Sequence, residues 1–534
     1  MSGLLFIVTT IIEVSQLVVQ YYKWSISRLC GKGFDLMVFA LFLPVVLISC
    51  NDNADIQNQG IAQKYRVILF TDILNEADDS QTLVRFLMYA NKMDIEGIIA
   101  VSSCHQYKGK NDSDPLRNTV HPNEIIKFVE AYGLVRSNLM LHETGWPTAE
   151  SLLHAVGAGP EGFGTRAIGK DKSTTGSRIV ANAIVKDDSR PLYIIINGGA
   201  NCLAQAIIDL QQQVSKEELD TLLGRIRVFD NAGQDNAGAW IAHHFPYIHY
   251  RRSSQQVYCF MNGQGPVVWD TTFYAGQGQH EWIKENVQQK HGPLGAFYPT
   301  RMKWQDPTTY HTIEGGGSGN FIGFVNHGLF NPEALHWGGW GGRFDTIKEL
   351  NIYGNQLKWA EPDLHGSEYE YRPYYMFPQA SDSWTDPETG IHYEGVCVPI
   401  FRWRRAYQND FAARMDWCVH TYDHSNHNPV AVIGDDTSDS FINLTAATGE
   451  NISLDASSSF DPDGDSLFYH WYVYPEAGSY KGNVHIDNNH QSSVKVAIPE
   501  DAGGSEIHII LEVSDNGLPE LYDYRRIIVT INNY

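Results

Sequence analysis

The stretch of this sequence best suited to chemistry is a group of four acids, Asp72, Glu76, Asp78 and Asp79, which directly follows the apolar run Val67–Phe70. Carboxylates crowded within a few ångströms repel one another, and a bound cation is the usual resolution. An all-oxygen ligand set favours a hard ion, Ca²⁺ or Mg²⁺, over zinc. The alternative interpretation is a doubly acidic helix N-cap, since Asp is a good capping residue. Capping, however, requires only one of these acids.

The residues on either side of the acids predict the elements that position them. The run Val67–Phe70 is apolar throughout, which predicts a parallel strand buried on both faces. After the acids, apolar residues recur on one face of a predicted helix, at Leu83, Phe86, Leu87 and Ala90. The acids therefore lie where a strand ends and a helix begins, which is where open α/β sheets bind their ligands. The dipole of the helix tolerates negative charge at that end.

Further strands and helices alternate between Tyr65 and Phe344. The predicted strands are 95–102, 192–196 and 225–229, and the predicted helices are 123–133, 178–186 and 203–212. This βαβ series predicts an open, mostly parallel sheet with flanking helices. Three of the predicted strands end in polar residues or glycines, at Asp72, Asn197 and Asp230, so these ends could converge on one crevice.

The region 310–344 is rich in glycine and contains the segments IEGGGSGNF and HWGGWGGRF. Long loops of this kind in a compact domain are usually functional or mobile. Trp337, Trp340 and Arg343 could form a wall on which a sugar ring stacks. The alternative, that these tryptophans pack into the core of the loop, has equal support. A helix predicted at 401–419 closes this domain.

A change in composition at His427–Pro429 marks the start of a second domain. Strands are predicted there at 452–454, 468–474, 494–498, 507–513 and 526–531, separated by the turn signals DPDGD and DNGLP. Short strands at this spacing predict a small Ig-like β-sandwich. Asp461, Asp463 and Asp465 could hold Ca²⁺, although a plain turn is the commoner outcome. The predicted parts are a targeting region at 1–50, a linker at 51–63, an α/β domain at 64–427 and a sandwich at 428–534.

The composition of the chain excludes several classes of function. A formal charge of −23 and a pI near 5.3 argue against nucleic acid as a partner, because phosphates require a basic face. The sequence has neither a Walker-type phosphate loop nor a Rossmann fingerprint. Its seven cysteines form no spaced metal motif. Thirteen Trp and 28 Tyr provide flat surfaces that suit sugar rings, although most aromatic residues are simply core.

The first fifty residues have the pattern of a targeting region. Arg28 and Lys32 precede the apolar run Leu36–Ile48, and Ser49-Cys50 follows it. This order resembles the bacterial lipoprotein signal, which is cleaved before a cysteine that becomes lipidated. A transmembrane anchor is the alternative, although the run is short for a membrane span. We expect lipidation at Cys50 and export to the cell envelope, in the outer membrane or the periplasm, with the lipid anchor as the membrane contact.

Several motifs together resemble one family, the bacterial cellulose-binding proteins with a nucleoside hydrolase-like domain. The acidic stretch is similar to the nucleoside hydrolase signature Asp-Thr-Asp-Pro-Gly-x-Asp-Asp, which holds Ca²⁺. The segments that resemble the family are Thr71–Arg85, Gly198–Ile207, Gln234–Trp240, Gly338–Phe344, Asn409–Trp417, Leu454–Asp465 and Ile507–Gly517. The resemblance covers residues 64–534. It implies a nucleoside-hydrolase-like α/β fold followed by an all-β Ig-like sandwich.

The resemblance also implies roles for individual residues. Asp72 would be a metal ligand and the base that activates a metal-bound water, and Asp79 would be a second ligand. Asp78 would bind a sugar hydroxyl, and the backbone carbonyl of Asn197 would complete the strand-end ligands. Ca²⁺ would lower the pKa of the water, which attacks an oxocarbenium-like anomeric carbon. The implied substrate-binding residues are Glu76, Asp78, Asn201, Gln234, Asp235, Glu314, Trp340 and Arg343.

The chain departs from the family pattern at two places. Five residues separate Asp72 from Asp78, against three in nucleoside hydrolases, so the loop between them is longer. Relatives read EGDTPS where this chain has Glu314-Gly315-Gly316-Gly317-Ser318. A carboxylate that could complete the metal site is therefore missing.

The sequence leaves three functions open. The first is a Ca²⁺-dependent hydrolase of glycosyl bonds in a saccharide, carried by an exported lipoprotein, with Asp72 and Asp78 as catalytic residues. The second is a non-catalytic protein that binds cellulose or another carbohydrate. The third is a nucleoside N-ribohydrolase. The substrate, the linkage and the oligomeric state are not specified by the sequence.

Overall fold

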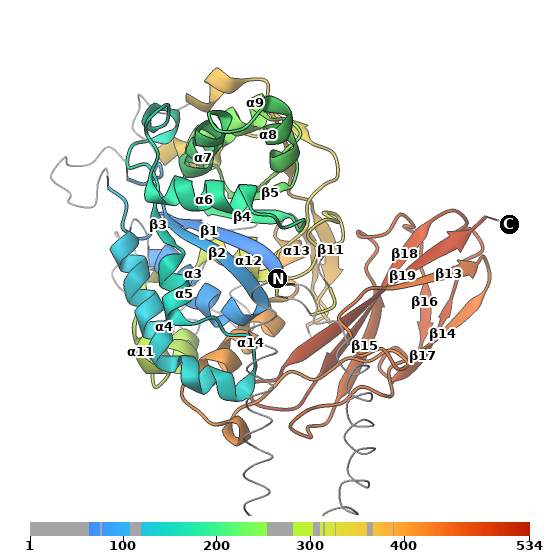
Figure 1. The fold of residues 1–534 in the computed structure, drawn as a ribbon. Helices are drawn as coiled ribbons and strands as arrows, with labels where there is room; N and C mark the ends of the chain where they lie inside the picture. The colour runs from blue at the N-terminus through green and yellow to red at the C-terminus, as the bar shows by residue number, and fades with distance from the viewer. Residues whose placement is uncertain are drawn as a thin grey trace, which may run out of the picture. The chain divides into compact units, whose positions relative to one another are not determined.

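Strand β1 (Tyr65–Thr71) lies inside the main sheet, between β2 (Met93–Ala100) and β4 (Leu192–Asn197), and is parallel to both (Figure 1). The computed structural model describes residues 64–74, 77–106, 119–253, 281–302, 310–312, 315–325, 327–329, 331–359, 367–387 and 389–533. Alternate residues of β1 enter two different hydrophobic clusters, with Val67 and Leu69 in one and Ile68 and Phe70 in the other. Both faces of the strand are thus buried, which explains why the run is apolar at every position.

The main sheet has eight strands in the order β3-β2-β1-β4-β5-β6-β10-β9. The other strands are β3 (Val156–Ala158), β5 (Ile226–Asn231), β6 (His249–Ser253), β10 (Tyr375–Pro378) and β9 (Glu349–Leu350). Strands β3 to β10 are parallel along this order, and β9 is antiparallel to β10. The chain runs outward from β1 through β2 to β3 and then returns to β4 on the other side of β1. The gap between β1 and β4 is therefore the topological switch point.

Helices cover both faces of this sheet (Figure 1). The face reached by Val67 packs against α3 (Ala77–Met88), α4 (Pro122–His142) and α5 (Ala149–His154). The opposite face packs against α6 (Thr175–Val185), α7 (Asn201–Gln211), α8 (Lys216–Leu223) and α9 (Ala237–His244). The predicted sheet with flanking helices is confirmed. Helix α4 runs past Gly133, its predicted end, and the glycine there allows close packing on α5, since an added Cβ would lie 2.9 Å from that of Ala149.

The rest of this domain consists of short elements. They are α11 (Gly292–Ala296), α12 (Gly319–Ile322), α13 (Val398–Phe401), α14 (Arg404–Asp416), the β7–β8 pair (Arg301–Met302, Tyr310–Thr312) and the β11–β12 hairpin (Asp382–Thr385, His392–Gly395). The single helix predicted at 401–419 is thus two helices, because the chain turns between Phe401 and Arg404. None of the described helices has the length and apolarity needed to cross a membrane.

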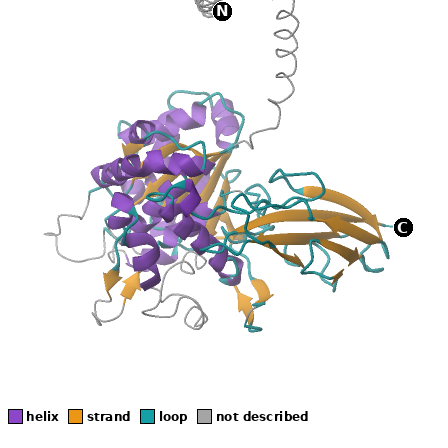
Figure 2. Cartoon of the chain, turned by 90° about the horizontal axis from the view of Figure 1, so that it is seen from below, coloured by secondary structure: helices purple, strands orange, loops and turns teal. Residues whose placement is uncertain are grey.

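The C-terminal part is built from strands and loops in two sheets (Figure 2). One sheet has the order β13-β19-β18-β15 (Ile442–Ala447, Tyr522–Asn532, Glu506–Ser514, Phe468–Val473), and the other has the order β14-β17-β16 (Asn451–Asp455, Ser493–Ala497, His485–Asp487). A hydrophobic cluster that includes Trp471, Ile509 and Val529 is buried between them. The β-sandwich prediction is confirmed. Strands β13 and β16 were not predicted.

The sandwich shares contacts with the α/β domain within one compact unit, Lys64–Tyr534. Arg526 on β19 donates hydrogen bonds to the carbonyl oxygens of Leu329, at 2.8 Å, and Trp337, at 3.0 Å. Tyr474 and Tyr524 of the sandwich belong to the same hydrophobic cluster as Phe324 of the α/β domain. The hydrophobic core is therefore continuous from one domain to the other.

Candidate functional site

The candidate site lies where β1, β4 and β5 end. Thr71, the last residue of β1, pairs with Asn197, the last residue of β4, and Ile196 pairs with Asp230 on β5. The residues that follow these strands are consequently neighbours. A Cβ added at Gly198 would lie 3.2 Å from the Cβ of Asp72, so the first residues after β1 and β4 touch. The convergence expected of the three strand ends is present, at the switch point of the sheet.

The structure brings three acids, Asp72, Asp78 and Asp79, together at this point. Asp72 and Asp79 are buried, and Asp78 is half-buried in the first turn of α3. Thr71 Oγ1 donates a hydrogen bond to Asp79 Oδ1 at 2.6 Å, and Ser103 Oγ donates one to Asp72 Oδ2. Burial and the neighbouring charges of Asp72 and Asp78 hold the pKa of Asp79 well above its usual range. The cluster thus favours a proton or a cation at neutral pH.

A strained turn leads from β1 into this cluster. Leu74 has a φ of +76°, a left-handed conformation that is an outlier for a bulky side chain. Strain of this kind persists only where the surrounding structure enforces it, and it collects at functional sites. Here the buried Ile73 and the helix that begins at Ala77 hold the chain on either side of the turn.

A glycine-rich loop closes over the cluster and makes contact with Asn197. Asn197 Nδ2 donates to the carbonyl oxygen of Gly317 at 3.2 Å, and Asn320 Nδ2 donates to Asn197 Oδ1 at 3.1 Å. A Cβ at Gly317 would lie 2.3 Å from Asn197 Nδ2, and one at Gly315 would lie 2.6 Å from the carbonyl oxygen of Asp78. Side chains cannot be accommodated at these positions without movement. The segment without the expected carboxylate therefore lies directly against the acids.

The neighbouring strand end, after β5, presents Asp235. Its carboxylate accepts hydrogen bonds from the backbone N–H groups of Asn201 at 3.0 Å and Ala237 at 2.9 Å, which lie at the beginnings of α7 and α9. Burial raises the pKa of Asp235 to about 7. Asn201 Nδ2 donates to Ser102 Oγ at 2.9 Å, and the carbonyl oxygen of Gln234 accepts from the N–H of Cys104 at 2.8 Å. The predicted residues Asn201 and Asp235 are thus joined by a hydrogen bond, whereas Gln234 bonds to the backbone of Cys104.

Asp230, the third predicted strand end, belongs to a buried ion-pair network. Arg252 pairs with the Asp230 carboxylate at 2.8 Å and with Glu368 at 2.6 Å, and the three side chains are buried. Tyr250 also donates to Asp230 at 2.9 Å. The negative charge of Asp230 is therefore compensated within the protein, by the ion pair with Arg252 and the hydrogen bond from Tyr250.

The other predicted site residues lie elsewhere. Trp340 is 2% exposed and packs on His327 with ring centroids 4.3 Å apart, so packing in a loop core describes its position. Arg343 pairs with Asp382 at 2.7 Å at the base of the β11–β12 hairpin. Glu76, Glu314 and Cys50 lie outside the described residues.

Two serines and one asparagine that were not predicted from the sequence contact the predicted residues. Ser102 and Ser103 lie two and three residues beyond the end of β2 and reach Asn201 and Asp72. The rule that drew attention to the ends of β1, β4 and β5 would have identified them as well. Asn320 lies in α12 after the glycine loop and carried no comparable signal.

The metal-binding capacity of the acids rests on their chemistry. Asp72, Asp79 and the backbone carbonyl of Asn197 are hard oxygen donors, which fit Ca²⁺. Burial, together with the charges of Asp72 and Asp78, raises the pKa of Asp79, so a proton or a cation is favoured there. Among the residues that the structure describes, however, no three His, Cys, Asp or Glu side chains stand together as a metal site. The donor set fits a cation, and the described residues supply no group of three such ligands to complete it.

Comparison with known proteins assigns the chain to a family. Residues 66–344 match the family described as cellulose-binding Sde182, nucleoside hydrolase-like domain, and residues 451–531 match the C-terminal domain of cellulose-binding protein Sde0182. This chain belongs to that family. The match covers the switch point and its acids, so the cluster lies in the family's nucleoside hydrolase-like domain.

One solved structure resembles nearly the whole chain. It is a nucleoside hydrolase-related protein from Saccharophagus degradans that is associated with carbohydrate metabolism. It is 35% identical, with a TM-score of 0.73, and the match covers 88% of this chain and 100% of that protein. A PKD domain from KIAA 1837 protein is 20% identical, with a TM-score of 0.15, over 21% of this chain and 94% of its own, which is too low to bear on the fold. No curated protein matches the chain.

Proposed function

We propose that this protein hydrolyses a glycosyl bond of a saccharide at the cluster of Asp72, Asp78 and Asp79. The observation that carries the proposal is the position of these acids. Two buried carboxylates and a third half-buried one meet at the switch point of a nucleoside hydrolase-like sheet, where such sheets bind ligands. Burying this much negative charge is unfavourable unless a cation or a proton compensates for it.

In this proposal calcium is the cofactor. Asp72, Asp79 and the carbonyl oxygen of Asn197 would hold it, because all three are hard oxygen donors at adjoining strand and helix ends. When bound, the ion lowers the pKa of a coordinated water and so supplies a nucleophile at neutral pH. The positive charge would also relieve the repulsion that raises the pKa of Asp79.

The residues of the chain then have distinct tasks. Asp72 accepts a proton from the attacking water, and the hydrogen bond from Ser103 keeps its carboxylate oriented. Asp79 is fixed by Thr71, at 2.6 Å. Asp78, which is half-buried, binds a hydroxyl group of the sugar ring. Asp235 and Asn201, at the next strand end, extend the substrate-binding surface.

A saccharide is a better candidate substrate than a nucleoside for two reasons. The matching families are described as cellulose-binding, and the 35% identical structure is associated with carbohydrate metabolism. The chain also carries a β-sandwich, and residues 451–531 in it match the C-terminal domain of a cellulose-binding protein. A carbohydrate role therefore accounts for both domains.

A second candidate is a carbohydrate-binding protein without catalysis. The observation that favours it is the contact of Gly315 and Gly317 with Asp78 and Asn197, because this chain has glycine where a carboxylate would complete the site. A degenerate hydrolase site could still hold a sugar. In either case we propose an exported protein anchored to the cell envelope through Cys50, on the strength of the lipoprotein-like signal.

The deciding experiment measures reducing ends released from cellulose and from soluble glucans, in calcium and in a chelator. We expect release by the wild type in calcium, and loss of at least a hundredfold in Asp72→Asn, since a general base contributes about 10²–10⁴-fold. Asp209→Asn, which neutralises a buried acid on α7, is the matched control. Saturable glucan binding without any release would favour the second candidate, and release that persists in Asp72→Asn would contradict the mechanism.

A further inference from the structure

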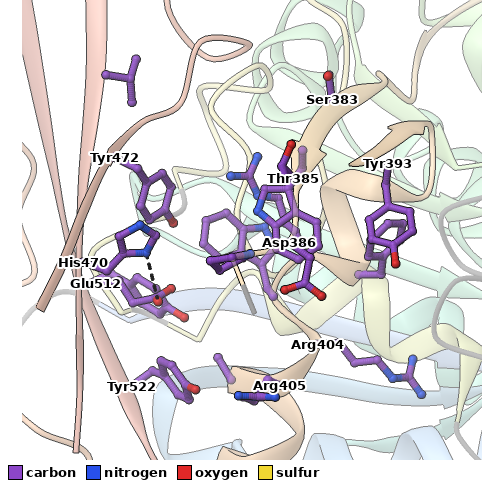
Figure 3. A pocket seen from close by; sticks show the side chains of 18 of the residues that line it. Ser383, Thr385, Asp386, Tyr393, Arg404, Arg405, His470, Tyr472, Glu512 and Tyr522 are labelled. Carbon is purple, nitrogen blue, oxygen red and sulfur yellow. Dashed lines mark ion pairs between the residues drawn. The ribbon is translucent and has the colours of Figure 1, made fainter. Parts of the chain in front are cut away.

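A cavity of about 500 Å³ lies between the α/β domain and the sandwich (Figure 3). Ligand sites in proteins commonly have volumes of about 300–1,000 Å³. One wall comes from the β11–β12 hairpin, the other comes from β15 and β18 of the sandwich, and the segment 401–406 joins them. None of the lining residues belongs to the cluster of acids at the switch point, so the cavity is a separate site.

The hairpin wall offers aromatic rings. Trp384 on β11 and Tyr393 on β12 are half-buried and stacked, with centroids 6.1 Å apart and planes 26° apart. Phe401 packs its edge against both, at 5.9 and 5.3 Å, and so fixes the pair from behind. This arrangement leaves a rigid aromatic surface beside the cavity, of the kind on which a sugar ring stacks.

The sandwich wall offers groups that form hydrogen bonds. His470 and Tyr472 on β15 and Glu512 on β18 line the cavity, with His470 Nδ1 and Glu512 Oε1 4.0 Å apart (Figure 3). Burial lowers the pKa of His470 to about 4 and raises that of Glu512 to about 7. At neutral pH this wall therefore presents a neutral imidazole, a partly protonated carboxyl and a phenol, which both donate and accept hydrogen bonds.

Arg402 lies where the two walls meet. Its guanidinium carbon is 5.9 Å from the Trp384 ring, 5.8 Å from the Tyr472 ring and 4.4 Å from the Tyr474 ring. Its side chain is 5% exposed and pairs with Asp382 at 3.5 Å. The contacts of Arg402 with the aromatic rings and with Asp382 thus hold the two walls in place. A ligand would therefore meet a preformed site.

We propose that this cavity binds a neutral oligosaccharide, with Trp384 and Tyr393 stacking on a sugar ring and with His470 and Glu512 bonding its hydroxyl groups. The ligand class rests on the proposed carbohydrate role, whereas the site is new and does not depend on hydrolysis. Stacking faces next to groups that donate and accept hydrogen bonds suit sugars, which have apolar C–H faces and hydroxyl edges.

A neutral ligand fits the charges of the cavity better than an acidic one. Arg402, Arg404 and Arg405 line the cavity together with Asp386 and Glu512, so positive and negative groups are interspersed. Arg402 is already paired, and the chain as a whole carries a formal charge of −23. An acidic saccharide would approach against this field and would meet two carboxyl groups inside the cavity.

Because both domains supply walls, the complete cavity exists only where the sandwich is docked on the α/β domain. A saccharide chain bound there would contact the hairpin and the sandwich at once.

The test measures binding of a soluble cello-oligosaccharide by calorimetry, with the full chain carrying Asp72→Asn to prevent hydrolysis. Adding Trp384→Ala should weaken the affinity at least tenfold, and Trp384→Phe should restore most of it because a ring is present again. Lys216→Met, on the exposed face of α8, is the control that should leave affinity unchanged. Thermal unfolding of each variant checks that the hairpin change has not unfolded the protein.

The possible outcomes separate this proposal from the proposed function. Equal affinity with and without Trp384, or no binding of the cello-oligosaccharide to a folded protein, would overturn the neutral-saccharide site. Binding of an oligouronate but not of the neutral oligosaccharide would overturn it as well. Hydrolysis that persists in Asp72→Asn would contradict the proposed mechanism and would be seen as released reducing ends, whatever the effect of Trp384→Ala on affinity.

Discussion

Replacing Asp79 with asparagine should stabilise the calcium-free protein while removing its response to calcium. Asp79 is buried beside Asp72 and Asp78, which raises its pKa well above the ordinary value. Asparagine has the same shape and no charge. Its Oδ1 can still accept the hydrogen bond from Thr71, and its Nδ2 can donate to the Asp72 carboxylate, so the substitution preserves the local contacts.

The expected magnitude follows from proton linkage. Where the folded pKa of an acid is raised, the folded protein binds a proton that the unfolded chain releases above pH about 4, so stability falls as pH rises. Each pH unit costs up to about 1.4 kcal/mol until the folded pKa is reached. Two charges about 4 Å apart at an effective dielectric constant of about 20 repel by about 4 kcal/mol, which bounds the gain. We expect Asp79→Asn to add about 1–3 kcal/mol at pH 7.5 and little at pH 4.5.

Calcium should stabilise the wild type more than it stabilises Asp79→Asn. A ligand at a concentration a hundred times its Kd stabilises a protein by about 2.7 kcal/mol. The wild type should gain this stability in calcium, and Asp79→Asn, which has lost a charged ligand, should gain little. The stability of the wild type relative to Asp79→Asn should therefore rise by about 2.7 kcal/mol between chelator and calcium.

Urea unfolding of the wild type and of Asp79→Asn gives the free energy of unfolding of each protein. It is measured at pH 4.5 and 7.5, in chelator and in calcium. Asp209→Asn is the matched control, because Asp209 is also buried but accepts hydrogen bonds from Ser173, Ser177 and Gln205 at 2.7, 3.0 and 2.7 Å. It should lose stability under every condition and keep the calcium response. The reasoning is refuted if Asp79→Asn destabilises the calcium-free protein at pH 7.5, or if it responds to calcium as the wild type does.

Two further predictions concern stability. Burial raises the pKa of both Asp235 and Asp523 to about 7, so the contribution of each acid to the free energy of unfolding in chelator should fall as pH rises from 5 to 8. Asp235→Asn and Asp523→Asn should therefore lose part of this fall relative to the wild type, and urea titrations that show an unchanged pH dependence would contradict this. Arg252→Met should cost about 3–5 kcal/mol because it leaves two buried carboxylates without their cation. Lys216→Met breaks an exposed pair and should leave stability nearly unchanged, so equal losses in urea unfolding would show that burial does not set the difference.

The central strands of the sheet could be predicted from the sequence because a strand that is buried on both faces is apolar at every position. Every residue of Val67–Phe70 and Leu192–Ile196 is buried, so each run is apolar from end to end. Strand β9, Glu349–Leu350, is exposed and pairs at one edge of the sheet, so nothing in its composition distinguishes it from a loop. The glycine at 133 is misleading for another reason, because it serves a helix contact that only the folded chain contains.

The acids of the site could be predicted because strand order brings the ends of β1 and β4 together. The surroundings of these acids could not be, since contacts such as that between Gly317 and Asn197 join residues 120 positions apart. Composition alone made Trp340 and Arg343 resemble a sugar-binding wall. Their actual partners, His327 and Asp382, are decided by tertiary packing.

Those partners give the Gly338–Phe344 motif a different meaning, as part of the joint between the two domains. Arg343 in this motif pairs with Asp382, which also accepts a hydrogen bond from Tyr474 of the sandwich at 2.5 Å and pairs with Arg402. Asp382 is the first residue of β11, so these contacts fix the hairpin that carries Trp384. The Gly338–Phe344 motif, which was predicted to stack on a sugar, thus lies behind the hairpin. It positions another aromatic pair, at the edge of the interdomain cavity, for that task.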